Sequence, residues 1–346
     1  MKAVVIHSAR DLRVEDAAAG EAGPNDVVVR VEAGGICGSD LHYYNHGGFG
    51  AIRLREPMIL GHEIAGTVEA VGDGVATIRP GDRVVVNPSL PCRSCRYCRQ
   101  AGYNHCLDMR FYGSAMRMPH IQGAFRQSLV ADVDQCHVFG DDVSTNEAAF
   151  AEPLAVALHA VSRAGSLLGK HVLVTGSGPI GALVVLAARH HGALEIVATD
   201  IVDEPLQKAL SIGADTVINV AAEPDRLADF EADKGTFDVV FEASGNPHAV
   251  VSALRVVKPR GTLIQLGLGG EATLPLNMIT AKEIELKGSF RFHEEFAIAV
   301  DLISRRLVDV KPLLTDILPL SRAVEAFELA SDRSRAMKVH LAMQDG

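Results

Sequence analysis

The residues best suited to chemistry in this sequence surround a single cysteine. Cys37 lies in the segment GGICGSDLHYY, residues 34–44, with no other cysteine within fifty residues. Ser39 and His42 follow it, and His62 comes twenty-five residues after Cys37. Zinc prefers thiolate and imidazole ligands, and a hydroxyl beside a histidine can pass a proton. We therefore interpret Cys37 and His62 as ligands of a catalytic zinc, and the serine and second histidine as a proton path. The alternative is a glycine-rich turn with a buried thiol.

A second group of cysteines has the spacing C-x2-C-x2-C-x7-C: Cys92, Cys95, Cys98 and Cys106. Four thiolates at this spacing are typical of a closed structural zinc site, and metal would order a segment with so few apolar residues. A ferredoxin-type cluster would have a shorter last gap followed by proline, whereas Leu107 follows here. We predict a structural zinc, with redox disulfides as an alternative. Cys136 is predicted to be a buried thiol.

A glycine motif between a predicted strand and a predicted helix indicates a dinucleotide site. Gly176, Gly178 and Gly181 match G-x-G-x-x-G after the apolar run HVLVTG. These glycines would permit the turn, the approach of a pyrophosphate and close helix packing. Asp200, nineteen residues after the third glycine, would bind both ribose hydroxyls of NAD and repel a 2′-phosphate. No Arg or Lys occupies positions 201–207, so we predict NAD over NADP. The alternative is a glycine turn without a cofactor.

Length and composition exclude several classes of protein. A chain of 346 residues with 48% hydrophobic residues can form two domains with a large core. The net charge of −10 argues against a nucleic-acid binder. No apolar run is long enough for a membrane span, and the N-terminus lacks the features of a signal peptide. We therefore expect a cytoplasmic protein, in which six cysteines indicate metal or catalysis before disulfides.

Two regions of the chain differ in their residue patterns, and these patterns predict the architecture that positions the residues above. Residues 1–150 contain short apolar runs broken by Gly, Pro and Asp clusters, as in a small β-barrel with long loops. From residue 171 strands and helices alternate, as in a doubly wound parallel sheet. The predicted fold class is therefore α/β plus β. The predicted strands are Ala3–Ile6, Val27–Val31, Ile64–Val71, Arg83–Val86, 171–176, Glu195–Thr199, Thr216–Asn219, Phe237–Glu242, Thr262–Gly267 and Lys338–Ala342, and the predicted helices are 151–164, Pro179–His191, Glu204–Ile212, Pro247–Val257, Glu295–Arg306 and Arg322–Ser331.

These motifs together resemble a known superfamily. CGSDLH, GHE, the four-cysteine segment, AEP and G-x-G-x-x-G, in this order, resemble the zinc-dependent medium-chain dehydrogenase/reductase superfamily. GGICGSDLHYY, PMILGHE and RFYGSAMRMPHIQGAF are most similar to L-idonate 5-dehydrogenases, and next to sorbitol (polyol) dehydrogenases. The resemblance implies a GroES-like catalytic domain of residues 1–150 and 295–346, with a Rossmann NAD domain, 151–294, inserted. It also implies a homodimer or homotetramer, paired through the edge strand Ile284–Phe290.

The resemblance implies further residues at the catalytic metal site. It implies that Cys37 and His62 bind the catalytic zinc with Glu63 as third ligand. Glu152, in AEP, would hold a water beside the metal or approach the metal itself. Asp40 would accept the other N–H of the histidine ligand and so fix its tautomer.

The implied reaction is oxidation of a secondary alcohol to a ketone, with hydride transfer to NAD. The proton would leave through Ser39, the nicotinamide ribose and His42. The substrate would be a sugar acid such as L-idonate, giving 5-ketogluconate, and a sorbitol or xylitol type of polyol is the alternative.

Substrate contacts are implied for Tyr43, Glu152 and Arg291. The polyol enzymes have a tyrosine where this chain has Phe292, so one hydroxyl contact is lost. A guanidinium can bind the carboxylate of a sugar acid in a bidentate way, and Arg291 is the first candidate for this role. Weaker candidates are Arg110, Arg117 and His120. The resemblance also implies that the cofactor is lined by Pro179, Ile180, Asp200, Gly267, Leu268 and Phe290, in addition to the three glycines.

Overall fold

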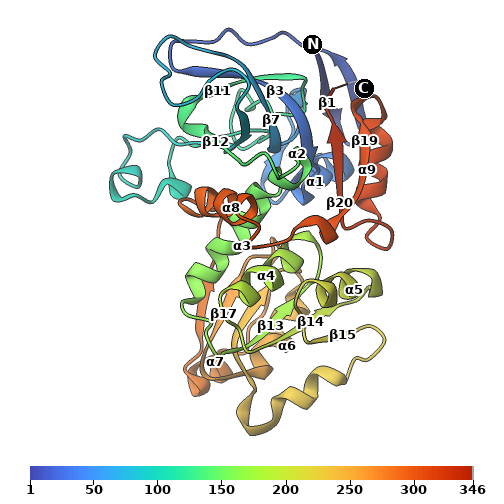
Figure 1. Ribbon diagram of the computed structural model, residues 1–346. Coiled ribbons are helices and arrows are strands. Elements are labelled where there is room, and N and C mark those ends of the chain that lie inside the picture. The colour runs from blue at the N-terminus through green and yellow to red at the C-terminus, as the bar shows by residue number, and fades with distance from the viewer. Residues whose placement is uncertain (345–346) are drawn as a thin grey trace. The chain divides into compact units, whose positions relative to one another are not determined.

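The computed structural model describes residues 1–344, which divide into two compact units (Figure 1). The first unit contains Met1–Glu152, Phe296–Asp332 and the described residues from Lys338 onward. The second contains Pro153–Glu295 and the short segment Arg333–Met337. No pattern in the sequence predicted that this short segment groups with the second unit.

The first unit is built on a seven-stranded sheet, in which β3 (Asp26–Gly35) lies between β7 (Glu63–Val71) and β20 (Lys338–Ala342). Burial alternates along β3, where Val27, Val29 and Val31 are fully buried, as expected for a strand with one face on a core. The other strands of this sheet are β8 (Arg83–Val86), β11 (Ser128–Asp132), β12 (Cys136–Val138) and β19 (Leu314–Pro319).

Smaller elements complete the first unit. The strands outside the large sheet are β1 (Lys2–Ser8), β2 (Asp11–Asp16), β4 (Gly48–Phe49), β5 (Ile52–Arg53), β6 (Met58–Ile59), β9 (Ser89–Leu90) and β10 (Arg110–Phe111). The helices are α1 (Gly38–His46), α2 (Thr145–Ala148), α8 (Glu295–Ser304), α9 (Ala323–Ser331) and the short 3-10 helices η1 (Cys98–Gln100), η2 (Tyr103–His105), η3 (Val133–Gln135), η5 (Lys311–Leu313) and η6 (Leu320–Arg322).

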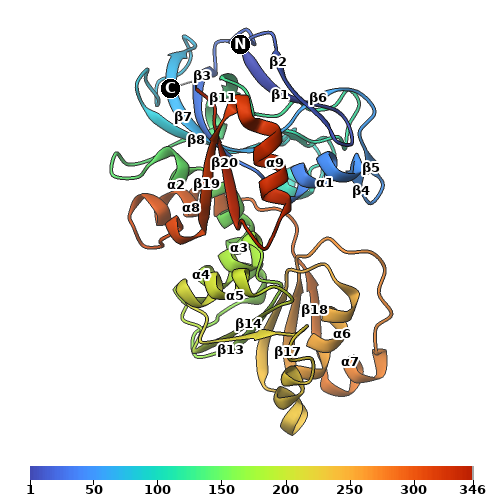
Figure 2. The same ribbon diagram turned by 90° about the vertical axis from the view of Figure 1, so that its right-hand side faces the viewer.

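The second unit is a six-stranded sheet in the order β15-β14-β13-β16-β17-β18, and all of its strands are parallel. Figure 2 shows α4 and α5 on one side of this sheet and α6 and α7 on the other. The strands are β13 (His171–Thr175), β14 (Glu195–Asp200), β15 (Thr216–Asn219), β16 (Phe237–Glu242), β17 (Val257–Gln265) and β18 (Glu285–Gly288). The helices are α3 (Ala151–Ala164), α4 (Pro179–His190), α5 (Asp203–Ser211), α6 (Pro247–Val256), α7 (Leu276–Lys282) and the 3-10 segment η4 (Arg226–Lys234).

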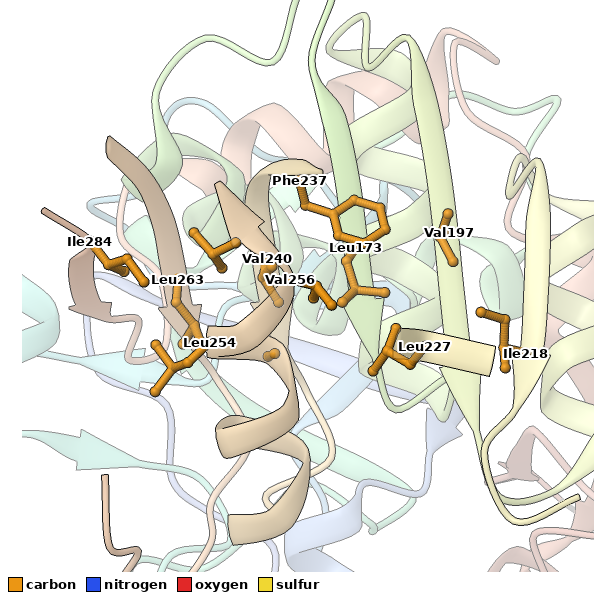
Figure 3. Close-up of a cluster of buried hydrophobic side chains, with 12 residues drawn as sticks. Leu173, Val197, Ile218, Leu227, Phe237, Val240, Leu254, Val256, Leu263 and Ile284 are labelled. Atoms are coloured by element: carbon orange, nitrogen blue, oxygen red, sulfur yellow. The ribbon is translucent and has the colours of Figure 1, made fainter. Parts of the chain in front are cut away.

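One cluster of buried apolar side chains in the second unit lies between this sheet and α6 (Figure 3), and α4 buries further apolar side chains. Leu173, Val197 and Phe237 from three strands meet Leu254 and Val256 of the helix, and all five are buried. The continuous apolar strands predicted from the sequence therefore belong to a sheet covered on both faces, and the predicted α/β plus β class is confirmed.

Each predicted strand and helix is present, and the glycine-rich turn given as the alternative around Cys37 is wrong, because this segment joins the end of β3 to the start of a helix, α1, that was not predicted. Gly34 and Gly35 end β3, and Gly38 begins α1. Gly34 and Gly35 are needed because there is no room for a side chain. A Cβ at Gly34 would lie 2.8 Å from the Phe125 ring, and a Cβ at Gly35 would lie 2.3 Å from Glu63 Oε2. Within residues 1–344, no helix combines the length and apolar character needed to cross a membrane.

Candidate active site

Cys37, His62 and Glu63 come together at one end of the first unit's sheet. The thiol precedes α1, and the histidine and glutamate stand at the start of β7. Pairing of β3 with β7 sets Gly35 opposite Glu63, which brings the two segments into register. One ligand atom from each of the three residues lies within 4.8 Å of the others. The structure therefore assembles the three residues predicted to bind the catalytic metal.

The polar atoms of this cluster fit a metal cation. Burial, together with the neighbouring Glu63 carboxylate, raises the pKa of the Cys37 thiol to about 12. Glu63 Oε1 and His62 Nδ1 are buried and have no hydrogen-bond partner among the described residues. Unpaired buried polar atoms beside a thiol are costly without a cation, whereas a zinc ion would bind the thiolate and neutralise the carboxylate.

A buried lysine that sequence reasoning missed lies behind this cluster. Lys338, the first residue of β20, forms an ion pair with Glu63, and both side chains are almost fully buried. Its ammonium also donates to the Ile36 carbonyl at 3.0 Å. Although burial opposes the charge, Glu63 and Cys37 raise the pKa of Lys338. A lysine within the apolar run KVHLA was the available signal, because a lysine in a buried strand needs an acidic partner.

Glu152 lies in the first turn of α3 and is buried. Burial raises its pKa to about 8, and the charges of Glu63 and Cys37 act in the same direction. Its carboxylate is not part of the ligand group within 4.8 Å that the described residues form. The structure thus brings Glu152 into the electrostatic surroundings of the cluster, outside the group of ligand atoms that lie within 4.8 Å of one another.

Asp40 supports the cluster in a different way from the predicted one. Its Oδ1 lies 3.8 Å from His62 Nδ1, which is too long for a hydrogen bond, so the predicted direct contact is wrong. Instead the carboxylate accepts the amide N–H of Cys37 at 3.1 Å and that of Gly61 at 3.2 Å. The carboxylate thereby fixes the backbone on both sides of the metal ligands.

The predicted proton path lies on α1. A hydrogen bond from Ser39 lowers the pKa of the Cys37 thiol, so the hydroxyl lies beside the cluster. His42 is exposed one turn later, with a pKa lowered by partial burial and by His46. Residues three apart on a helix share a face, so the hydroxyl and the imidazole lead from the cluster toward solvent.

Tyr43 is more buried than a simple substrate contact would be. Its side chain is 2% exposed, and its hydroxyl accepts the amide N–H of Ala115 at 3.0 Å. The ring also packs against Phe49. The tyrosine therefore holds the segment that follows the four-cysteine group against α1.

The four clustered cysteines converge as predicted. One sulfur each from Cys92, Cys95, Cys98 and Cys106 lies within 4.8 Å of the others, and all four are free thiols. Backbone amides donate to these sulfurs, including the N–H of Cys95 to Cys92 at 3.3 Å and that of Asp108 to Cys106 at 3.3 Å. Amide donors stabilise thiolates, so the group fits a tetrahedral zinc. Cys136 is a separate buried thiol, as predicted.

The glycine motif of the second unit has the geometry of a phosphate-binding turn. Gly176 has φ +83°, which favours glycine, and Gly178 caps α4. A Cβ at Gly181 would lie 1.7 Å from the Gly176 carbonyl oxygen, so helix and strand could not pack with any other residue there. A cavity of about 480 Å³ opens beside this turn, lined by Gly176 and Asp200 among others.

Asp200 lies at the end of β14, nearly fully buried, with both oxygens engaged. Oδ2 accepts the N–H of Ser177 at 2.8 Å, and Oδ1 accepts that of Ile201 at 2.7 Å. Arg333 adds an ion pair at 2.6 Å. Positions 201–207, the usual place for such a cation, hold no Arg or Lys, and Arg333 follows Asp200 by 133 residues, so the motif did not predict this partner.

Five other residues predicted to line the cofactor are not among the described residues that line this cavity: Pro179, Ile180, Gly267, Leu268 and Phe290. Leu268 is 68% exposed, and Arg291 lies over the Phe290 ring at 5.1 Å. His120 is buried and bonded to the Arg55 N–H at 2.9 Å, which suits a structural role. Arg117 pairs with Asp108, and Arg110 is exposed.

Comparison with known proteins matches both units. Residues 23–141 match the alcohol dehydrogenase GroES-like domain, and residues 179–305 match the zinc-binding dehydrogenase family. L-idonate 5-dehydrogenase (NAD(P)(+)) of Escherichia coli (strain K12) is 42% identical over 318 residues, covering 92% of each chain. Sorbitol dehydrogenase of Gallus gallus is 36% identical and covers 98% of this chain and 95% of the relative.

Solved structures agree with these matches. The crystal structure of L-idonate 5-dehydrogenase from Escherichia coli K-12 superposes with a TM-score of 0.95 at 39% identity, over 99% of this chain and 97% of that one. The two metal-ligand groups and the family matches confirm the predicted cofactors, NAD and two zinc ions per chain. This chain belongs to the zinc-dependent medium-chain dehydrogenase family and is a dehydrogenase that acts on CH–OH groups.

Proposed function

We propose that this enzyme oxidises L-idonate to 5-ketogluconate with NAD. The observation that carries the proposal is the 42% identity to an L-idonate 5-dehydrogenase over 92% of both chains. A sorbitol or xylitol type of polyol oxidation is the second candidate, since several sorbitol dehydrogenases are 36–37% identical over more than nine-tenths of this chain.

Cys37, His62 and Glu63 would hold the catalytic zinc, and the unpaired buried atoms of the last two support this assignment. A zinc ion bound there supplies Lewis acidity, which lowers the pKa of a substrate hydroxyl. Glu152, with its pKa raised to about 8, is suited to hold a proton or a water beside the metal. The second metal-ligand group would have a structural role.

Ser39 and His42 would carry the substrate proton to solvent, as their shared face on α1 supports. In the second unit, Asp200 and the three glycines would hold NAD, which accepts the hydride. We propose the first unit as the catalytic domain and the second as the cofactor domain.

Arg291 remains our candidate for the carboxylate of a sugar acid, because a guanidinium can bind it in a bidentate way. Tyr43 and Glu152 remain candidates for substrate hydroxyls. Because the tyrosine hydroxyl already accepts the N–H of Ala115, it would contact substrate while keeping this structural hydrogen bond.

We further infer a cytoplasmic homodimer or homotetramer. β18 is the edge strand of the parallel sheet, and Leu286 on it is 45% exposed, which supports pairing between copies at this edge. Light scattering coupled to size exclusion tests the oligomer, and a monomer at micromolar concentration would refute it.

The substrate proposal is tested by NADH formation from L-idonate, gluconate, sorbitol, xylitol and threonine under the same conditions. We expect the highest kcat/KM with L-idonate. Higher efficiency with sorbitol or xylitol favours the second candidate, and an absence of turnover with any sugar acid rejects the first.

A further inference from the structure

An ion pair within the dinucleotide cavity has no role in the binding of NAD described above. Arg333 Nη2 lies 2.6 Å from Asp200 Oδ2, and both residues line the cavity. Asp200 is the carboxylate expected to repel a 2′-phosphate, yet a cation lies directly against it. Pairing with a guanidinium neutralises that carboxylate and weakens the repulsion.

The arginine is placed to contact a ligand. Its side chain is 50% exposed, whereas that of Asp200 is 2% exposed, so the guanidinium covers the acid on the open side. Arg333 Nη2 would also lie 3.9 Å from a Cβ at Gly178, which puts it beside the phosphate-binding turn. Asp200 keeps its backbone donors Ser177 and Ile201 if the arginine moves toward a ligand.

We propose that Arg333 determines cofactor specificity by giving a 2′-phosphate a cationic partner, so that this site accepts NADP as well as NAD. The proposal rests on the dinucleotide site proposed above. A planar guanidinium matches phosphate in a bidentate way, and an arginine near the ribose is the usual means of accommodating a 2′-phosphate. Here that arginine comes from the segment Arg333–Met337 instead of from the stretch after β14.

Arg255, the second arginine among the described residues that line the cavity, has a different acidic partner. Arg255 Nη1 lies 4.0 Å from Glu231 Oε1, and Glu231 also lines the cavity. Arg333 differs because its partner is Asp200, the residue that distinguishes the two cofactors. A 2′-phosphate beside this acid would therefore meet a guanidinium already in place.

The test uses nucleotide binding to the full-length, zinc-loaded protein without substrate. Adenosine 5′-monophosphate and adenosine 2′,5′-diphosphate differ only in the 2′-phosphate, and titration calorimetry gives both Kd values. We expect the wild type to bind both. Arg333→Leu should weaken binding of the 2′,5′-diphosphate by about tenfold or more, the value of a charge-assisted hydrogen bond, and leave the monophosphate within about twofold.

Two further variants sharpen the test. Arg335→Leu is the matched control, because Arg335 is exposed in the same segment and outside the described residues that line the cavity, so it should change neither Kd. Asp200→Asn should strengthen binding of the 2′,5′-diphosphate, since it removes the negative charge and releases Arg333. Thermal unfolding of each variant establishes that it is folded.

The outcomes separate the possibilities. An equal loss for both nucleotides in Arg333→Leu would indicate a contact with the 5′-phosphate and overturn the proposal. Unchanged affinity for both, or a wild type that does not bind the 2′,5′-diphosphate, would also overturn it. If the wild type binds neither nucleotide nor NADH, the dinucleotide site itself is rejected.

Discussion

Lys338 and Glu63 form a buried ion pair directly beside the metal-ligand cluster, with side chains 2% and 1% exposed. The lysine comes from the last strand of the chain and the glutamate from β7. The lysine ammonium pairs with Glu63 Oε2, whereas Glu63 Oε1 is buried without a hydrogen-bond partner among the described residues, so this second oxygen is free to bind a metal.

Removing the lysine charge should be strongly destabilising. Lys338→Met leaves the buried carboxylate of Glu63 without its cation, and breaking a buried pair costs about 3–5 kcal/mol. Urea unfolding of metal-loaded protein measures this loss. Lys287→Met is the control, because that lysine pairs with an exposed Glu285 and should cost less than about 1 kcal/mol. Equal losses in the two variants would contradict the role given to Lys338.

Zinc stoichiometry should divide the cysteines into three classes. Wild-type protein should contain two zinc ions per chain, and Cys37→Ser and Cys95→Ser should each lose one, as each removes one ligand from a different group. Cys136→Ser should retain both ions, since this buried thiol belongs to neither group. Metal analysis of freshly purified protein tests this, and loss of zinc from the Cys136 variant would count against the assignment.

Gly35 should tolerate no side chain. A Cβ there would lie 2.3 Å from Glu63 Oε2 and 3.1 Å from His340 Nε2, so Gly35→Ala must displace the glutamate. We expect a loss of about 1–3 kcal/mol and weaker binding of the catalytic zinc. Gly38→Ala is a close control, because its Cβ would meet nothing within 4 Å. A Gly35 variant as stable and as metal-loaded as the Gly38 variant would show that the described packing is wrong.

The contribution of Glu295 to stability should depend on pH. Burial opposes ionisation, but the hydrogen bond with His159 and backbone donors lower the pKa of Glu295 from 4.5 to about 2. A folded-state pKa below the unfolded value adds stability above pH 4.5, which is lost as the pH falls toward 2. Glu295→Gln should therefore be less stable by about 1.5–3 kcal/mol between pH 5 and 7.

Below about pH 4.5 the stability difference between wild type and Glu295→Gln should shrink, because the native carboxylate starts to lose its advantage over the unfolded one. Urea unfolding of both proteins across this range measures the difference. A difference that is independent of pH down to 3 would contradict the pKa assigned to Glu295.

The sequence predicted the parts of the fold that depend on local pattern. Continuous apolar strands and the glycine motif predicted the second unit, and cysteine spacing predicted the structural metal group. Helix α1 was missed because GSDLHYYNH has no apolar period, and its start depends on Asp40 accepting the N–H of Cys37.

Long-range partners could not be predicted in the same way. Lys338 pairs with Glu63, and Arg333 pairs with Asp200. The partners are far apart in sequence and meet only because the fold brings their segments together. A search of neighbouring positions cannot find such pairs. The Asp40 and His62 side chains lie about 1 Å too far apart for the predicted hydrogen bond, and residue types alone do not determine such a distance.

In the proposed mechanism, Cys37 holds the metal on which oxidation depends. The most direct measurement compares wild type and Cys37→Ala in NADH formation from L-idonate, with binding of NADH to each variant measured in parallel. We predict that kcat/KM falls by at least about a thousandfold, because the metal contributes several kcal/mol to lowering the barrier. Binding of NADH should be unchanged. Near-normal turnover by Cys37→Ala would contradict the account.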